Sequence, residues 1–155
     1  MTHVQDTPHT LHTSDAPRVH GPPSERNGWI AYDFAIVRVV PHVHLGGFVA
    51  AGVVMHARTA EFLQMRTLLD PADLQTHVPD VDAELLSRYL RAWQAVCAGD
   101  PAAGAVALAP PSERFHWLTA PRSDVLQCSA VHEGLCTDLD VALDELFSTY
   151  VVLGV

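Results

Sequence analysis

The sequence has no lysine, and its charge is strongly one-sided. All nine basic residues are arginine, 18 residues are acidic, and the formal net charge is −9. Because a nucleic-acid interface needs clustered basic side chains against the phosphates, and the sequence has no basic block, we expect no nucleic-acid partner. We attribute the exclusive use of arginine to GC-rich codon usage, with selection for the fork-shaped guanidinium group as the alternative.

Cysteine is scarce, and long apolar runs are missing. The three cysteines, Cys97, Cys128 and Cys136, are odd in number and lack CxxC spacing, so we expect neither a disulfide framework nor a zinc knuckle. No window reaches the roughly 18 apolar residues that a membrane span requires. The N-terminus has no basic region followed by an apolar run. We therefore expect no membrane contact and a cytoplasmic location.

The sequence also lacks the recognisable motifs of cofactor and metal chemistry. No stretch matches a phosphate-binding loop or a nucleophile elbow, so we expect no cofactor. His42 and His44 form an H-x-H pair, but two ligands are not a site, and a third ligand from His56 or Asp33 is conjecture. Irregular spacing argues against a metal clasp among the N-terminal histidines, which are His3, His9, His12 and His20. We expect no bound metal.

What is present is one foldable segment behind an unusual N-terminus. Residues 1–28 combine proline, serine, threonine and histidine with hardly any large apolar residue, which predicts a disordered leader. The chain has 155 residues, of which 48% are apolar and 17% charged, and this is enough for one hydrophobic core. We therefore predict a single domain over residues 29–155.

The apolar pattern of that segment predicts an α+β fold. Runs of β-branched and aromatic residues predict strands over residues 30–40, 48–56, 61–69 and 125–130. Apolar spacing of three and four residues predicts a helix between Pro79 and Gly99 and a second helix after Thr137, and residues 100–111 form a linker. The order strand, strand, strand, helix, strand, helix indicates an antiparallel or mixed sheet of about four strands packed by two helices.

A charged residue interrupts the first predicted strand. Arg38 stands in the middle of Ala35-Ile-Val-Arg-Val-Val40, among aliphatic side chains. An unpaired buried charge costs several kcal/mol, so the guanidinium group must pair with a carboxylate, face a polar ligand or reach an exposed strand face. We favour the carboxylate and keep the other two alternatives open.

The densest group of polar side chains lies in residues 114–136, where two arginines, two histidines and three hydroxyls stand among large apolar residues. In an extended segment Arg114 and His116 share one face, while Trp117 points to the other. Together with Arg122, they would present two guanidinium forks and an imidazole to an anion. The alternative is a loop brace, in which the same side chains hydrogen-bond to the backbone.

The same stretch contains candidates for catalysis. His132 follows a predicted strand, and an imidazole there is suited to act as acid or base near neutral pH. A covalent mechanism needs a nucleophile beside a base. The residues close in sequence to His116 or His132 are Ser123, Cys128, Ser129 and Cys136. We take His116, His132 and Ser123 as the catalytic candidates, and we interpret Cys128 as a small buried apolar residue.

Three groups of residues resemble a known family. They are Tyr32-Asp-Phe-Ala-Ile-Val-Arg-Val-Val-Pro41 with Phe48-Val and Gly52-Val-Val, Arg114-Phe-His-Trp-Leu with Arg122-Ser123, and Val131-His-Glu-Gly134. Through them, residues 30–147 are similar to the bacterial family catalogued as domain of unknown function 3037 (DUF3037). The positions that match the polar motifs of the family are Arg38, Arg114, His116, Trp117, Arg122, Ser123, His132 and Gly134.

The resemblance implies no established activity. Members of the family are often encoded beside a HipA-like kinase, which implies a binding or accessory role within an operon. One departure from the family concerns the turn after the first strand, where this chain has Gly47 and Ala50 in place of a carboxylate and an amide. If those side chains serve a reaction or a partner in the relatives, this chain has lost them.

Two functions follow from these residues. The first is a small intracellular accessory or protein-binding module that binds an anionic group, with a HipA-like kinase as the partner that the family resemblance implies. Its ligand-binding residues would be Arg38, Arg114, Arg122 and Trp117, with His116 and His132 on the same rim. The second is a small enzyme with His116 or His132 as general acid/base and with Arg114 and Arg122 stabilising negative charge.

Both functions require that two arginines and two histidines of residues 114–136 surround one cavity.

The apolar end of the chain, residues 150–155, is an unusual tail to leave in water. It either covers a partner subunit, which would make the protein a homo-oligomer, or folds onto the sheet edge.

Overall fold

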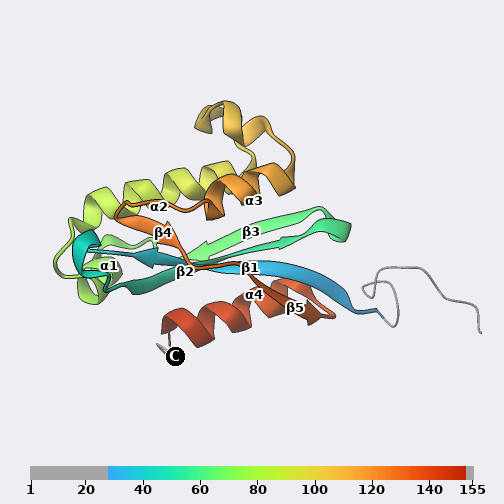
Figure 1. Ribbon diagram of the computed structural model, residues 1–155, viewed down its shortest axis with the longest axis horizontal. Helices are drawn as coiled ribbons and strands as arrows, with labels where there is room; N and C mark the ends of the chain where they lie inside the picture. The colour runs from blue at the N-terminus through green and yellow to red at the C-terminus, as the bar shows by residue number, and fades with distance from the viewer. Residues whose placement is uncertain (1–27, 153–155) are drawn as a thin grey trace, which may run out of the picture.

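The fold is a sheet covered by helices on both faces. The computed structural model describes residues 28–152. In Figure 1, α2 and α3 lie on one face of the sheet and α4 lies on the other. The disordered leader predicted for residues 1–28 lies, apart from Gly28, outside the described residues, as do residues 153–155.

Five strands form one antiparallel sheet, so the predicted α+β class is confirmed. The strands are β1 (Ile30–Val39), β2 (Val49–Ala57), β3 (Phe62–Thr67), β4 (Leu126–Cys128) and β5 (His132–Cys136). Their order is β3-β2-β1-β4, with β5 also paired to β1. Strand β1 therefore lies at the centre of the sheet. It pairs with β2 along one of its sides and with both β4 and β5 along the other.

Four α-helices and several short helical turns complete the structure. The helices are α1 (Pro71–His77), α2 (Ala83–Ala98), α3 (Pro111–Thr119) and α4 (Leu139–Phe147). The turns are η2 (Val43–Leu45), η3 (Arg58–Ala60), η4 (Pro101–Ala103), η5 (Ala105–Leu108) and η6 (Ser148–Val152). The prediction of about four strands and two helices thus fell short of five strands and four helices.

Strand β1 is buried on both faces, as its unbroken apolar pattern predicts. Ala35, Val37 and Val39 belong to the core beneath α1, α2 and α3. Phe34 and Ile36 belong to the second core, which α4 covers. Because side chains alternate along a strand, the side chain of Arg38 falls on the face of Phe34 and Ile36.

A bulge in β2 lies opposite Arg38. Val37 pairs with Gly52 and Arg38 pairs with Ala50, so Ala51 is an extra residue on the β2 side. A bulge shifts the alternation of side chains and is a common way to redirect them. Here it places Ala50 on the same face as Arg38, while Ala51 is buried in the other core.

Three elements were not predicted. Helix α1 begins at Pro71, with the Asp70 carboxylate accepting the amide of Ala72, and β5 was taken for a loop. The third is α3, which covers residues expected to be extended; it starts with Pro111 at its first turn. A proline fits the first turn of a helix because its missing N–H has no partner there in any case.

The linker predicted over residues 100–111 also has structure. Asp100 caps η4 by accepting the amide of Ala102 at 2.9 Å, and η5 follows. These turns place Ala107 in a buried position beside α2 and α3.

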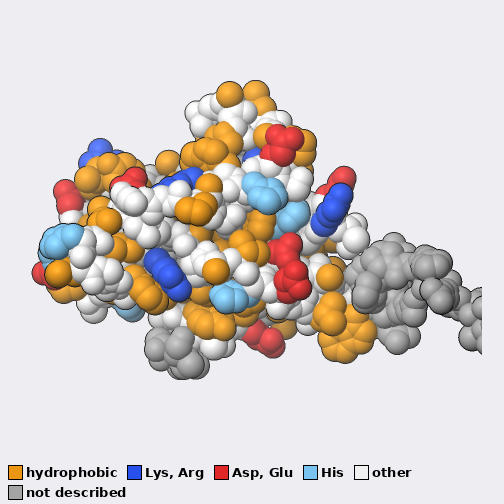
Figure 2. All heavy atoms as spheres, in the orientation of Figure 1, with side chains coloured by type: hydrophobic (Ala, Val, Ile, Leu, Met, Phe, Trp, Pro, Cys, Tyr) orange, Lys and Arg blue, Asp and Glu red, His pale blue; other side chains and the backbone are white. Residues whose placement is uncertain are grey.

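On the face seen in Figure 2, the arginine side chains lie apart from one another among apolar and acidic side chains, without forming a basic patch there.

Gly52, which pairs with Thr67, provides a test of the register between β2 and β3. A Cβ at this position would lie 2.5 Å from Thr67 Cγ2 and 2.7 Å from the Arg66 carbonyl oxygen, so β3 would have to move. We expect Gly52→Ala to lower the free energy of unfolding by about 1–3 kcal/mol in urea denaturation. Gly47→Ala is the matched control, because nothing lies within 4 Å of a Cβ there, and its effect should stay within about 0.5 kcal/mol. Equal effects of the two substitutions would contradict the register.

Candidate functional site

Arg114 stabilises the end of a helix. Its Nη1 donates to the carbonyl oxygens of Cys97 at 2.6 Å and Val96 at 3.3 Å, and its Nε donates to the Ala109 carbonyl at 3.0 Å. The last carbonyls of a helix lack partners within the helix and carry partial negative charge, so a guanidinium group is well placed there. Arg114 therefore joins α2, η5 and α3 through main-chain atoms.

Arg122 is held by two indole rings. Its guanidinium carbon lies 4.6 Å from the ring centroid of Trp93 and 4.5 Å from that of Trp117. Its Nη2 also donates to the Trp117 carbonyl oxygen. Stacking of an arginine on tryptophan stabilises by about 0.5–2 kcal/mol, so this contact fixes the segment after α3 against α2.

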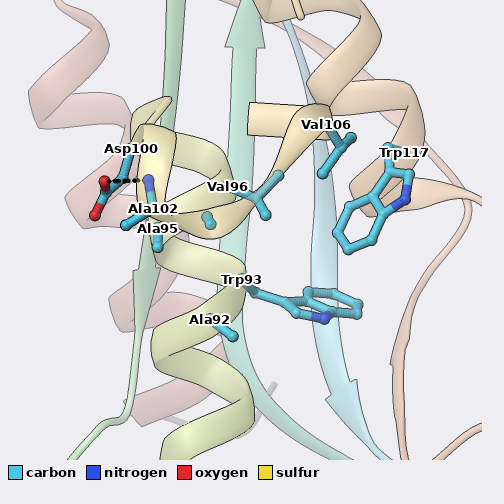
Figure 3. A pocket seen from close by; sticks show the side chains of 9 residues that line it. Ala92, Trp93, Ala95, Val96, Asp100, Ala102, Val106 and Trp117 are labelled. Atoms are coloured by element: carbon cyan, nitrogen blue, oxygen red, sulfur yellow. Dashed lines mark hydrogen bonds between the residues drawn. The ribbon is translucent and has the colours of Figure 1, made fainter. Parts of the chain in front are cut away.

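The two indoles also line a pocket on the outer side of α2 (Figure 3). Its volume is about 370 Å³, and alanines of α2 and η4 form much of its wall. Asp100 is the only charged residue in the lining, and its carboxylate already accepts the amide of Ala102. Ligand pockets need polar groups that fix the orientation of the ligand, and Asp100, at the rim of this largely apolar pocket, is the one charged group in its lining.

His116 lies beside another histidine. It is exposed on α3, and the neighbouring charges that act on His56 include His116, Asp33 and Arg58. The His56 side chain is buried and stacks on Phe115, with ring centroids 5.1 Å apart. Burial lowers the pKa of His56 below its ordinary value, and the nearby Asp33 opposes this shift. His56 therefore belongs to the packing of α3 on β2, whereas His116 is exposed on α3.

A second pocket lies on the opposite face of the sheet. Its volume is about 200 Å³, and it is lined by Ile36, Arg38, Phe48, Ala50, Ser129, His132 and Tyr150. These residues come from β1, the start of β2, the connection of β4 to β5, β5 itself and η6. Ala50, whose small side chain lines this pocket, belongs to the turn and strand start that the sequence resemblance singled out.

Arg38 is the charged group of this pocket. Its guanidinium carbon lies 4.1 Å from the centroid of the Phe48 ring. Its Nε is buried, and no hydrogen-bond acceptor for it lies among residues 28–152. Within the same residues no carboxylate forms an ion pair with Arg38. The prediction that favoured a carboxylate partner is therefore wrong for the part of the chain that the structure describes.

The other polar side chains of the pocket differ in whether they already form hydrogen bonds within the protein. Ser129 Oγ accepts the amide of Ile36 at 2.9 Å and donates to the Ala130 carbonyl at 2.8 Å. The His132 ring is exposed and packs against Phe34, with ring centroids 5.4 Å apart. Ser129 thus braces β1 against the β4–β5 connection, while Arg38 and His132 face the opening.

The four side chains expected to share a cavity do not do so. Arg114 and Arg122 pack on α2 and α3, whereas His132 lines the pocket on the α4 face. The expectation rested on an extended segment 114–117, and the segment is helical. The structure brings together two pairs of candidates, Arg122 with Trp117 and Arg38 with His132. Phe48 and Tyr150 are residues of the Arg38 pocket that sequence reasoning missed.

The candidate nucleophiles are poorly placed for covalent chemistry. Ser123 is exposed in the segment between α3 and β4. Burial raises the pKa of Cys128 to about 12, although Arg122 and Arg38 oppose the shift, and burial raises the pKa of Cys97 to about 12 as well. Since the thiolate is the reactive form, both cysteines are inert at neutral pH.

Among residues 28–152, no three histidine, cysteine or acidic side chains are grouped so that they could hold a metal ion. His42 and His44 do lie near each other, with ring centroids 6.2 Å apart, but His42 is 3.9 Å from Asp80 and no third ligand joins the two rings. None of the helices in this part of the chain is both long and apolar enough to cross a membrane.

The fold and the pocket define a small α+β domain with a candidate anion site on the α4 face of its sheet. Residues 34–151 match the family model described as "Protein of unknown function (DUF3037)", and the chain belongs to this family. The match covers β1 from Phe34 onward, the pocket residues and the α3 segment, so the family resemblance is confirmed. Neither a curated protein nor a solved structure matches the chain.

Arg114 gives a prediction on stability. Arg114→Met removes the three donors to main-chain carbonyls while it keeps much of the apolar stem, and we expect a loss of about 1.5–3 kcal/mol in the free energy of unfolding. The control is Arg91→Met on the exposed side of α2, which should change stability by about 0.5 kcal/mol or less. If the two variants melt at the same temperature, Arg114 is not a helix cap.

His56 gives a prediction on pH. Because burial lowers its pKa in the folded state, the unfolded chain binds a proton at His56 more readily than the folded chain does. The stability that comes from neutral His56 is therefore complete above its ordinary pKa of 6.5 and decreases as the pH falls below that value. His56→Phe keeps the stacking on Phe115, and its stability should fall less steeply in acid, as measured by urea denaturation over a pH series. An unchanged slope would contradict the assignment.

Proposed function

We propose that this chain is a small accessory module that binds a partner protein by holding an anionic group of that partner in the pocket of Arg38 and His132. The observation that carries the proposal is the buried Nε of Arg38, which has no acceptor among the described residues. A buried donor without a partner costs about 1–3 kcal/mol. An anion from outside the domain would recover this cost.

Stacking on Phe48 does not replace such a ligand. A cation–π contact stabilises the charge of the guanidinium group through the face of the ring, but the N–H donors lie in the guanidinium plane and stay free. Elsewhere in the described residues a carboxylate does pair with an arginine, as Asp144 does with Arg66. None of them is placed at Arg38, which supports a ligand-binding role.

The size and surroundings of the pocket favour a protein partner. Small-molecule sites usually measure about 300–1,000 Å³. The Arg38 pocket, at about 200 Å³, is small for a nucleotide or a cofactor but suits one side chain. Phe48 is 51% exposed beside the pocket, and Val152 is exposed at the end of η6, so apolar contact area adjoins the charge. Such a mixture is typical of protein interfaces.

The partner that we propose is a HipA-like kinase, on the strength of the family resemblance. An accessory role fits the geometry better than catalysis does. Arg114 is engaged by main-chain oxygens and Arg122 by two indoles, so neither is available to stabilise charge beside His132. His116 faces the opposite side of the sheet from the Arg38 pocket, next to His56.

Arg38→Gln tests the proposal. The change removes the charge and keeps a polar side chain, and we expect the binding free energy for the proposed HipA-like kinase partner to weaken by about 2–5 kcal/mol. Isothermal titration calorimetry measures the affinity, and the control is Arg91→Gln, an exposed arginine on α2 on the other side of the sheet. Unchanged affinity of the Arg38 variant, with a folded protein by circular dichroism, would refute the proposed role of the pocket.

A further inference from the structure

We infer that the anion held by Arg38 is a single carboxylate on a short apolar stem, as in a glutamate or aspartate side chain of the partner, and not a phosphoryl group. This inference rests on the proposed function and adds the chemical class of the ligand. It follows from the charge of the pocket, from the shape of the free donor and from the apolar walls.

The charge of the pocket matches one negative charge. Arg38 is the only arginine in the lining, and the chain has no lysine that could add a second permanent charge. A carboxylate carries one negative charge, whereas a phosphorylated side chain carries about −1.5 to −2 at neutral pH. Because the chain already has a formal net charge of −9, the surplus charge of a phosphoryl group would remain uncompensated.

The free donor of Arg38 also favours a carboxylate. Nε and the neighbouring Nη form one edge of the guanidinium plane, and this edge offers two parallel N–H groups that match the two oxygens of a carboxylate. Nε is the nitrogen without an acceptor. The Phe48 ring covers one face of the guanidinium group, with the guanidinium carbon 4.1 Å from the ring centroid, so a ligand would meet Arg38 through its N–H groups and not through that face.

A phosphoryl group would lack donors here. It presents three acceptor oxygens and is normally surrounded by several N–H or O–H groups. The hydroxyl of Ser129 is already committed to the main chain at Ile36 and Ala130, so His132 and Tyr150 are the other polar side chains of the lining. The remaining lining residues, Ile36, Phe48 and Ala50, are apolar and suit methylene groups behind a carboxylate.

The test uses the full chain with ¹⁵N-labelled arginine and follows the Arg38 Nε–Hε signal by NMR. The probes are sodium propionate, inorganic phosphate and N-acetyl-glutamate amide, titrated separately at constant ionic strength and pH. We expect saturable shifts with propionate and with the capped glutamate, and a dissociation constant at least tenfold larger for phosphate. In uniformly ¹⁵N-labelled Arg38→Lys, which keeps the charge and loses the fork, the affinity for propionate should fall at least tenfold, as reported by the Phe48 amide signal.

Each of the other outcomes contradicts either the carboxylate inference or the proposed function. If phosphate binds as tightly as propionate or more tightly, the carboxylate inference is wrong, while an anion-binding module remains. If propionate binds but the capped glutamate does not, the ligand is a free acid and not a side chain of a partner. If no probe shifts the Arg38 signal, the inference fails, and the effect of Arg38→Gln on kinase affinity then decides separately whether the proposed function survives.

Discussion

Every part of the pocket depends on the position of β1 at the centre of the sheet. Its backbone is paired on both edges and its faces are covered by two separate cores. Such a strand leaves no room for a charged side chain unless the neighbouring layers open around it. They open at Arg38, where the β2 bulge, the β4–β5 connection and η6 meet. The pocket is thus the space that a charge requires inside an otherwise apolar strand.

The motif residues singled out in the sequence occupy two kinds of surroundings. Arg114 closes the end of α2, Arg122 lies between two indoles, and Gly134 leaves space for the Tyr32 ring, which crosses it from β1. These residues hold the layers together. Arg38 and His132 are placed at an opening instead. Residues of one sequence motif can therefore serve packing or, as we propose for Arg38 and His132, recognition. The surroundings of each residue in the fold distinguish the two roles.

The sequence allowed much of the fold to be predicted, because the long elements carry strong local patterns. Strands β1 and β2 and helix α2 are such cases. Helices α1 and α3 also carried a signal, a proline at the first turn, that was overlooked. Strand β5 had none, since His132 and Gly134 are weak strand formers and the strand exists through its pairing with β1. Arg38 could be recognised from its apolar neighbours, but its approach to Phe48 and Tyr150 depends on tertiary packing, which spacing along the chain does not reveal.

The bulge at Ala51 separates two kinds of evolutionary change. From Gly52 onward, β2 is fixed by its neighbours on both sides, so substitutions there disturb the whole sheet. The turn before the bulge is exposed over residues 42–48, yet it supplies Phe48 to the pocket wall. Mutations in this turn can therefore reshape what the pocket accepts with little penalty in folding. Divergence of ligand preference among relatives would then be concentrated in a stretch of a few residues, while the scaffold stays constant.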